Sequence, residues 1–569
     1  MNHCESTWTV DRTQATSSAG MVAAKTPQAA RAGAQVLRNG GNAVDAAVVT
    51  ALVAGVAEPW MNGLGGGGYL IRHDSATSQT DVVAYPMVAP ASAYESMFEL
   101  AGTGTDAALF GWPSVVGAAN IVGHRAVCVP GTVSGLSTAL ARFGSLSWAT
   151  ALEPAIDLAD RGLPVTWHTT MEIARDLGNL RKFPATEAIL CPAGVVPWSV
   201  GESNPAVIRN PDLADTLRAL ANDGPRSFYE GAIASHIVTH MNEGGAMYSD
   251  ADLASYEARI ESPLTVTYRG TDVHTLDHGS GGPTLAESLR LCESMLPDNY
   301  SSADPAALHL MAQAFAASFA DRFAYLADPE FVDCPIEALL SDHYIGSRAS
   351  SILPDKVSSV MAGPREQLGV RHDLAPSIPD YSSGGSTTHL SVIDKDGVAV
   401  TLTQTLLSLW GSRVTIPGTG VIMNNGMMWF DPEPGRPNSI AGRKRPLSNM
   451  APVLLVRNGQ SVAALGASGG RRIMNCVAQI ALNLIDHKME MQQAVSAPRI
   501  DRSTMKLIAS SRMDHETVDA MRAMGHDLAL SDESLFFGDL SSPACVAFAD
   551  GTFHSGVDPF YYPSTASGV

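Results

Sequence analysis

Residues 384–405 read GGSTTHLSVIDKDGVAVTLTQT, and this stretch decides how the whole chain is interpreted. Two segments of alternating apolar and polar side chains flank the turn sequence Asp394–Gly397. The glycine suits the positive φ of a tight turn, so the stretch predicts a β-hairpin. A three-residue loop predicts these cross-strand pairs: Ser391 with Thr401, His389 with Thr403, and Thr387 with Thr405. A two-residue loop shifts the register by one residue and leaves the last pair nearly opposite.

One face of this hairpin is expected to be polar and the other apolar, because side chains alternate between faces along a strand. The polar face carries Thr387, His389, Ser391, Thr401, Thr403 and Thr405. The apolar face carries Leu390, Val392, Val400 and Leu402. The polar face has two interpretations, a solvent-facing ladder of threonines or a site of chemistry.

The chemical interpretation depends on Thr387, which follows a flexible Gly-Gly-Ser sequence. Its hydroxyl could attack the carbonyl of Ser386, cut the chain and free the α-amine of Thr387. An N-terminal threonine combines nucleophile and base, because its own amine can take the hydroxyl proton. Thr405, on the neighbouring strand, could hydrogen-bond to that hydroxyl and orient it.

Composition indicates an acidic protein with a substantial core. The chain has 569 residues, 45% of them hydrophobic and 17% charged, with a formal net charge of −20. This length suggests several domains or one large layered unit. No basic cluster is present, which argues against a nucleic-acid binder. Seven scattered cysteines without a CxxC pair, no secretion-type leader and no membrane-length apolar run favour a cytoplasmic protein without a membrane partner.

Local patterns predict a mixed α and β chain. Residues 27–39 and 43–56 are expected to be helices, with Pro27 in the first turn of one and Asn42 capping the other. The segment from about 130 to 350 is mostly helical in pattern, interrupted by a hairpin at 264–276. Strands dominate after about residue 386, and residues 364–385 are the best linker candidate.

Two glycine motifs need separate interpretation. Residues 63–68 fit GxGxxG, but they follow a helix and open a strand, the reverse of a dinucleotide site, so a close approach of backbones is the better explanation. Residues 466–470 fit GxSxG between a predicted strand and helix, the context of a serine nucleophile at Ser468. Its candidate acid and base partners are Asp514, His515, His526, Asp527 and His554. The same loop could instead offer glycine amides as an oxyanion hole.

Several motifs in order resemble the γ-glutamyltranspeptidase family of N-terminal-nucleophile hydrolases. TTHLSVIDKDGVAVTLTQTLLSLWG, at 387–411, is similar to the segment that carries the nucleophile. The N-terminal block at 20–70 and the motifs VPGTVSGL, EPAIDLADRGLPV, YRGTDVHTLDHGSGG, FADRFAYLADPEFV, KRPLSNMAP, GASGGRRI and APRID complete the series. The resemblance therefore extends over nearly the whole chain.

The resemblance implies an α+β fold, a four-layer αββα sandwich, made as a precursor and cut between Ser386 and Thr387. The products would be a large subunit, 1–386, and a small catalytic subunit, 387–569, interwoven as a heterodimer that could pair further. By motif match, Thr387 is the nucleophile and Thr405 its hydrogen-bonding partner. Gly469 and Gly470 match the oxyanion hole, which demotes Ser468. Ser448 and Asn449 match a substrate-contacting Ser-Ser pair.

Departures from the family pattern fall in the acyl pocket. The resemblance places Pro86 where the family has an arginine for the α-carboxylate, and Trp429 where it has an aspartate for the α-amine. Leu407 replaces Asn or Glu, and Gly426 and Met428 stand where the family tends to be polar. Because a zwitterionic group needs both charged partners, ordinary γ-glutamyl substrates should bind poorly. Arg413, Arg471 and Arg472 could be replacement anchors for an anionic acyl group, although a surface or helix-start charge is the preferred interpretation of each.

The hypothesis is an autoprocessing threonine amidohydrolase or acyltransferase without cofactor or metal. The segment between Phe430 and Lys444 is short compared with family members that carry a lid, which favours hydrolysis by water. Cephalosporin-acylase-like and oxamate-amidohydrolase-like members offer precedents for another acyl group on a small-molecule amide. Two competing hypotheses are a non-catalytic binding descendant of the fold and a serine hydrolase that uses Ser468.

Overall fold

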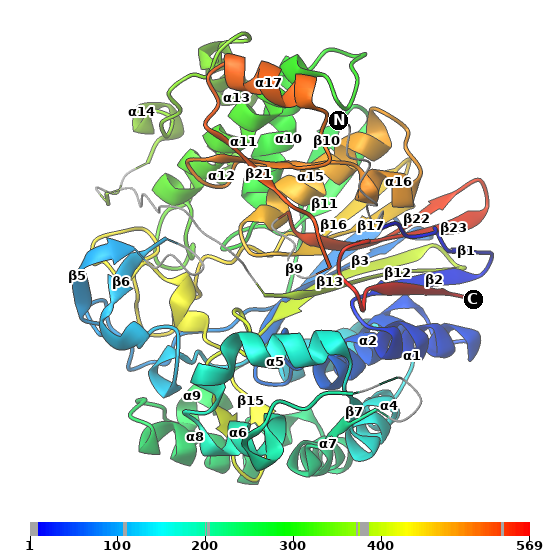
Figure 1. The fold of residues 1–569 in the computed structure, drawn as a ribbon, viewed down its shortest axis with the longest axis vertical. Coiled ribbons are helices and arrows are strands. Elements are labelled where there is room, and N and C mark those ends of the chain that lie inside the picture. The colour runs from blue at the N-terminus through cyan, green and yellow to red at the C-terminus, as the bar shows by residue number, and fades with distance from the viewer. Residues whose placement is uncertain are drawn as a thin grey trace, which may run out of the picture.

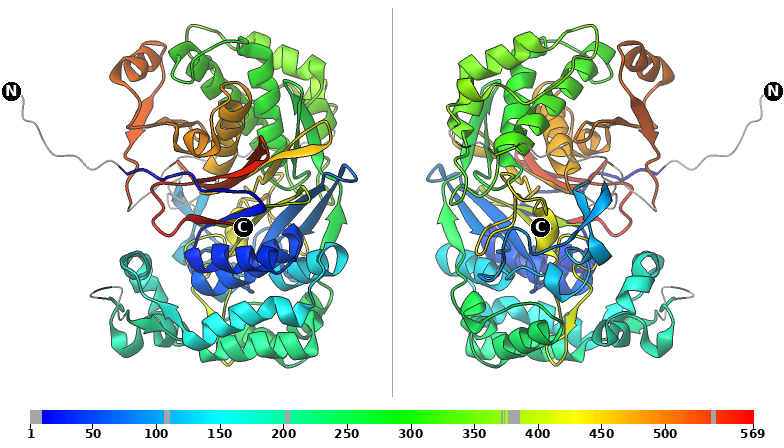
Figure 2. Two further views of the ribbon diagram at one scale, coloured as in Figure 1. Left: turned by 90° about the vertical axis from the view of Figure 1, so that its right-hand side faces the viewer. Right: turned by 90° about the vertical axis from the view of Figure 1, so that its left-hand side faces the viewer.

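Two β-sheets stacked face to face, with helices on both outer surfaces, form the molecule (Figure 1). The computed structural model describes residues 10–105, 111–199, 201, 205–370, 372, 374–375, 386–535 and 540–569. Figure 2 shows the same layers from the two sides. The expected αββα sandwich is confirmed.

The first sheet has seven strands in the order β24-β2-β12-β13-β3-β4-β9, and neighbouring strands are antiparallel. Their bounds are β24 Thr565–Gly568, β2 Gly20–Ala24, β12 Thr388–Asp394, β13 Val398–Thr405, β3 Gly67–Asp74, β4 Gln79–Tyr85 and β9 Arg259–Glu261. The hairpin of the quoted stretch is therefore central, with strands from the first hundred residues on both sides of it.

The second sheet follows the order β1-β23-β22-β17-β16-β11-β10, with β18 paired to β22. Its bounds are β1 Thr16–Ser17, β23 Thr552–Val557, β22 Ser542–Ala549, β17 Gln460–Leu465, β16 Val453–Arg457, β11 Thr271–Thr275, β10 Leu264–Tyr268 and β18 Ala467–Ser468. β10 and β11 are the predicted hairpin inside the helical region, which confirms that expectation.

The outer layers are helical. Beside the first sheet lie α1 Pro27–Arg38, α2 Ala43–Ala57, α3 Thr132–Phe143, α4 Trp148–Arg161, α5 Trp167–Leu180, α7 Pro211–Asp223 and α8 Ala232–Glu243 (Figure 1). Beside the second sheet lie α10 Gly282–Met295, α11 Pro305–Tyr325, α13 Asp342–Ser351, α15 Arg472–Ile485, α16 Met491–Ser496 and α17 His515–Ala523. The two predicted N-terminal helices are confirmed within one or two residues.

The helix α2 packs on the strands β12 and β13 and begins as its sequence predicts. Asn42 caps it, accepting hydrogen bonds from the N–H groups of Val44 and Asp45, and Asp45 bonds back to the Asn42 N–H. Every residue of α2 except Gly55 is buried, because the helix lies between the sheet and further helices. Its alanine and valine content suits this position, since small side chains let the helix approach its neighbours closely.

The glycine run at 63–68 lies at the start of β3, as expected, and serves close approach. A Cβ on Gly66 would lie 2.3 Å from the carbonyl oxygen of Thr405, and one on Gly68 would lie 2.5 Å from that of Thr403. Larger residues would therefore push β3 away from β13. The glycines therefore allow β3 to pack closely against β13, the strand that carries Thr405.

Three apolar cores occupy the spaces between the four layers. One lies between the first sheet and its helices and includes the apolar hairpin face: Leu390, Val392, Val400 and Leu402. A second lies under α10, α11 and α15. The third lies between the sheets and continues past the strand ends to Trp429.

Part of the predicted linker, residues 376–385, lies outside the described residues, and a short helix, α14 Arg365–Leu368, occupies its first part. Within the described ranges, no helix combines the length and hydropathy needed to cross a bilayer. The same ranges contain no group of three or more His, Cys, Asp or Glu side chains suited to hold a metal ion.

Candidate active site

The hairpin has the register that a three-residue loop predicts. Its pairs run from Thr388 with Gln404 to Ile393 with Ala399, and they include His389 with Thr403 and Ser391 with Thr401. Gly397 takes the expected positive φ of 81°. The ladder ends one residue short of Thr387 and Thr405.

The polar face of the hairpin is buried between the two sheets, so the solvent-facing ladder is wrong. All six of its predicted members are at most 3% exposed. The Nδ1 atom of His389 lies 2.8 Å from the Thr403 hydroxyl, and the Thr401 hydroxyl donates to the carbonyl of Leu465 in the second sheet at 2.9 Å. Burial lowers the pKa of His389 to about 3, so the imidazole is neutral at ordinary pH.

The hydroxyls of Thr387 and Thr405 meet at one acceptor, the carbonyl oxygen of Ser386. Thr387 Oγ1 donates to it at 2.6 Å and Thr405 Oγ1 at 2.8 Å. The Leu407 N–H donates to Thr405 Oγ1 at 2.7 Å, which fixes the direction of that hydroxyl. We expected the Thr405 hydroxyl to hydrogen-bond to the Thr387 hydroxyl. Instead, both hydroxyls donate to the carbonyl oxygen of the peptide bond that would be cut.

The segment after Thr405 holds three non-glycine residues in the left-handed region: Leu407 at φ 91°, Trp410 at 63° and Arg413 at 67°. Such conformations cost free energy and persist only where packing imposes them. All three side chains are buried. This strained turn carries the N–H that holds Thr405.

The GxSxG loop passes close to the hairpin from the second sheet. A Cβ on Gly466 would lie 2.1 Å from Cε1 of His389, and β18 packs beside β12. Gly469 and Gly470 follow β18 with φ of 141° and 64°, directly before α15. No acceptor bonded to their N–H groups is found in the described part of the chain. The two amides are thus available as oxyanion donors.

Ser468 lacks the surroundings of a serine nucleophile. Its hydroxyl donates to the carbonyl of Ser542 at 3.3 Å. The suggested partners are engaged elsewhere: Asp514 caps α17, His526 lies 2.8 Å from His309, and His554 lies 3.1 Å from Gln14. Within the described residues, no hydrogen bond joins His515 or Asp527 to Ser468. The geometry therefore gives no acid-base relay for this serine.

Ser448 and Asn449 are held by Arg322, a residue that the sequence alone did not single out. The guanidinium of Arg322 donates to the carbonyl of Ser448 at 2.6 Å and to Asn449 Oδ1 at 3.0 Å. It also donates to the carbonyl of Ser280 at 2.6 Å, so it joins the 280 loop to the 448–449 loop. Within the described residues the buried Nδ2 of Asn449 finds no acceptor, which leaves both of its N–H donors free.

The departures from the family pattern lie in an apolar environment. Leu407, Met428 and Trp429 belong to the core between the sheets and are at most 4% exposed. Trp429 ends the short helix η5, Gly426–Trp429. The side chains at these three positions are themselves apolar, so they supply neither a cation for a carboxylate nor an anion for an ammonium.

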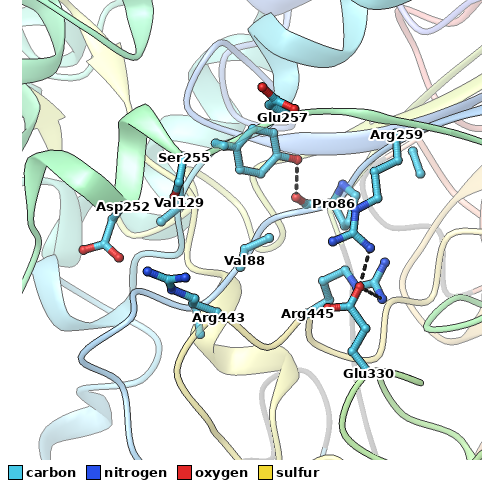
Figure 3. Close-up of a pocket in the computed structure, with 13 residues that line it drawn as sticks. Pro86, Val88, Val129, Asp252, Ser255, Glu257, Arg259, Glu330, Arg443 and Arg445 are labelled. Carbon is cyan, nitrogen blue, oxygen red and sulfur yellow. Dashed lines mark hydrogen bonds and ion pairs between the residues drawn. The ribbon is translucent and has the colours of Figure 1, made fainter.

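Pro86 is buried at the end of β4, where its carbonyl accepts a hydrogen bond from Tyr256 at 2.6 Å. It lines a cavity of about 290 Å³ (Figure 3). Arg259 and Arg445 in this cavity both pair with Glu330, and Arg443 lies on its other side. Proline thus supplies backbone and apolar surface at a position where the family resemblance implies a cation.

The three arginines considered as anchors are all buried. Arg413 pairs with Asp176 at 2.5 Å and donates to the Ser408 hydroxyl at 2.9 Å, so it is a structural residue of the strained turn. Arg471 lies over the rings of Trp112 and Phe323, 5.3 and 4.8 Å from their centroids. Arg471 and Arg472 stand at the start of α15, the helix-start position that the sequence interpretation preferred, and Arg413 is a buried structural charge rather than a surface one.

Sequence reasoning also missed Glu58, the residue that ends α2. It is fully buried and accepts a hydrogen bond from the hydroxyl of Thr388, next to the candidate nucleophile, and one from Tyr561. Burial raises the pKa of Glu58 to about 7. The available signal was a carboxylate directly before the glycine run, in a segment otherwise without charge.

Comparisons with known proteins agree with this fold. The family model described as gamma-glutamyltranspeptidase matches residues 29–559. The acylase ACY 1 proenzyme of Pseudomonas sp. (strain SE83) is 35% identical over 96% of this chain and 95% of its own. The glutathione hydrolase proenzyme of Bacillus subtilis (strain 168) is 31% identical over 95% and 90%. A crystal structure of cephalosporin acylase from Bacillus halodurans shares the fold, with a TM-score of 0.84, 24% identity and coverage of 100% and 99%. The chain therefore belongs to the gamma-glutamyltranspeptidase family of hydrolases and acyltransferases.

Proposed function

We propose that this enzyme cuts its own chain between Ser386 and Thr387 and then uses Thr387 as the nucleophile of an amide hydrolase. The observation that carries the proposal is the convergence of the Thr387 and Thr405 hydroxyls on the Ser386 carbonyl oxygen, at 2.6 and 2.8 Å. The products are residues 1–386 and 387–569, which stay together as a heterodimer. The proenzyme names of both relatives support this step.

In the first reaction, Thr387 Oγ1 attacks the carbonyl carbon of Ser386. The C–N bond between the two residues breaks, the nitrogen of Thr387 takes the hydroxyl proton, and water hydrolyses the resulting ester. Negative charge develops on the Ser386 carbonyl oxygen during the attack. The Thr405 hydroxyl already points at that oxygen, and preorganised donors of this kind are among the largest contributors to catalysis.

In the second reaction, the freed α-amine of Thr387 takes the proton of its own hydroxyl as the oxygen attacks a substrate amide. An acyl ester forms on Thr387 and the amine product leaves. The amides of Gly469 and Gly470 stabilise the oxyanion, while Ser448 and Asn449 bind the substrate through their free donors. Water then releases the acyl group, or an amine accepts it.

The acyl group that suits the residues at these positions is apolar rather than γ-glutamyl. Leu407, Trp429 and Pro86 replace the polar and charged side chains that would bind an amino-acid head group. At these positions a zwitterion lacks the charged partners that the family resemblance implies, and losing such a partner costs several kcal/mol. An acylase-type substrate, with an uncharged acyl chain against Trp429, meets no such penalty. The similarity to an acylase proenzyme supports this choice.

Two measurements test the proposal. A denaturing gel of the purified wild type should show two fragments whose masses match residues 1–386 and 387–569, and Thr387→Ala should give one band. Turnover of hexanoyl-p-nitroanilide should exceed that of γ-glutamyl-p-nitroanilide in kcat/KM. Comparable values would overturn the altered acyl preference, and an uncut wild type would overturn the threonine mechanism.

A further inference from the structure

The four residues after α2 contact the chain on both sides of the Ser386–Thr387 bond. The carbonyl of Trp60 accepts a hydrogen bond from the Ser386 hydroxyl at 3.2 Å, and Met61 Sδ lies 2.6 Å from the same oxygen. On the other side, Glu58 Oε2 accepts a hydrogen bond from Thr388. One short segment thus holds the residue before and the residue after the candidate nucleophile.

Glu58 is the charged member of this segment, and each of its oxygens accepts from a hydroxyl. The second donor is Tyr561, whose hydroxyl lies 2.6 Å from Oε1 and also accepts from Trp60 Nε1 at 3.2 Å. Among the described residues, no cation lies within ion-pair distance of Glu58. The charged groups that face it are Lys25, beyond the end of β2, and Glu172, on α5. Lys25 favours the carboxylate form, while Glu172 and burial oppose it.

Holding Thr388 determines where Thr387 points. Neighbouring side chains of a strand lie on opposite faces, so a bond from Thr388 to the helix side turns Thr387 toward the space between the sheets. There its hydroxyl donates to the Ser386 carbonyl, which also accepts a hydrogen bond from the Thr405 hydroxyl. If the start of β12 could rotate, these groups would lose their alignment, and small errors in the position of reacting atoms cost large factors in rate.

The other end of β12 provides a matched comparison. Asp394 Oδ2 accepts a hydrogen bond from the N–H of Ala43 at 2.8 Å, so a buried carboxylate fastens β12 to the beginning of α2. Glu58 fastens the same strand to the end of α2. The two carboxylates therefore join the same helix and strand, one far from the candidate scissile bond and one beside it.

We propose that Glu58 is a positioning residue for chain cleavage, acting through Thr388 to align the Thr387 hydroxyl with the Ser386 carbonyl. The proposal rests on the proposed role of Thr387. Glu58 touches none of the reacting atoms, and the proton of the attacking hydroxyl still ends on the nitrogen of Thr387. Its ionised form accepts from both hydroxyls, and protonation replaces one acceptor oxygen with an O–H.

The test follows full-length precursor from a short cell-free synthesis, with cleavage read by intact mass and folding by thermal unfolding. Glu58→Ala and Glu58→Gln should slow cleavage by about tenfold or more. Asp394→Asn, the matched control, should lower the unfolding temperature yet cleave at the wild-type rate. Thr388→Val removes the same hydrogen bond from its other partner, so Glu58→Gln/Thr388→Val should be no slower than the slower single variant.

A pH profile separates positioning from a general loss of stability. The wild-type cleavage rate should rise as the pH passes through about 7, where Glu58 ionises, and the Glu58→Gln rate should lack that step. Equal slowing in Glu58→Gln and Asp394→Asn, or independent effects of Glu58→Gln and Thr388→Val, would overturn the inference. If Glu58→Ala does not fold, the cleavage rate of Thr388→Val tests the proposal. A Thr388→Val rate equal to that of wild type would reject it.

The outcomes also distinguish this inference from the proposed function. Wild type that is cut, Thr387→Ala that is not, and Glu58→Gln that is cut at the wild-type rate would reject the positioning role only. A chain that is cut at the same bond without the Thr387 hydroxyl would reject both.

Discussion

Leu407 belongs both to the end of the β12–β13 hairpin, through its N–H, and to the cluster around Trp429, through its side chain. The two regions differ in the interactions that hold them together. At the hairpin end, hydroxyls, a peptide N–H and a carbonyl form a connected hydrogen-bond chain from Leu407 through Thr405 to Ser386. In the cluster, the side chains of Leu407, Met428 and Trp429 pack among other apolar residues. The groups proposed to react thus meet at one hydrogen-bonded carbonyl, whereas the residues proposed to select the acyl group are apolar. Reaction and selection can change independently when separate side chains serve them.

The strongest way to break this comparison is to remove the proposed nucleophile. Thr387→Ala should abolish cleavage and lower turnover by at least about a thousandfold, because no hydroxyl remains to form the ester. Intact mass and amide-hydrolysis rates measure the two effects. Thr387→Ser, which keeps a hydroxyl, is the control and should still be cut. Cleavage of the alanine variant would show that another group performs the chemistry.

A second, smaller effect is expected at the donor that faces the scissile carbonyl. Thr405→Val keeps the shape of the side chain but removes the hydroxyl that donates to the Ser386 oxygen. Losing one preorganised oxyanion donor typically costs roughly a hundredfold in rate. The cleavage time course should show this loss, and the unfolding temperature should also fall because the buried Leu407 N–H loses its acceptor. A cleavage rate equal to that of wild type would show that the Thr405 hydroxyl takes no part in the cleavage reaction.

A change confined to the apolar region should alter selection and spare cleavage. Leu407→Asn suits the positive φ of 91°, because asparagine tolerates that region better than leucine. It should lower kcat/KM for hexanoyl-p-nitroanilide roughly tenfold, the usual size of a lost apolar pocket contact. Self-cleavage should keep the wild-type rate. If both reactions slow together, the two regions are not separable.

The smallest effect is expected for the serine of the GxSxG loop. Ser468→Ala removes one hydrogen bond, to the carbonyl of Ser542, worth about 1 kcal/mol of unfolding free energy. Cleavage and turnover should be unchanged, since the loop contributes through the amides of Gly469 and Gly470. Chemical denaturation and the two activity assays provide the measurements. An inactive Ser468→Ala enzyme would restore the serine-hydrolase hypothesis.

Short-range sequence patterns predicted much of this structure. The register around Gly397 and the cap at Asn42 depend on neighbours in sequence, and the glycine run at 63–68 indicates a close approach by its composition alone; all three are confirmed. The burial of the polar hairpin face was not predictable from alternation, because a second sheet covers it. Hydroxyls and a neutral His389 occupy that buried face because they satisfy one another.

The site residues that the sequence missed depend on contacts between distant segments. Arg322 joins loops at 280 and 448, and Glu58 meets Tyr561 more than five hundred positions away. The local sequence pattern does not identify such residues, because their roles depend on residues that are distant in sequence and come into contact only in the folded protein. Arg413 shows the opposite case, since a suspected ligand anchor proved to be bound internally by Asp176.

The order of strands in the first sheet has a consequence for the life of the molecule after the proposed cut. β12 and β13 would belong to one fragment, while β2 and β3, which flank them, would belong to the other. Strands of the two fragments would therefore alternate within one sheet, and dilution alone would not separate the fragments. Unfolding would part them, and reassembly would then require two chains to meet. The uncut chain can refold by itself, whereas the cut protein would have to reassemble from two chains. After scission, the persistence of the fold would therefore depend on a slow unfolding rate.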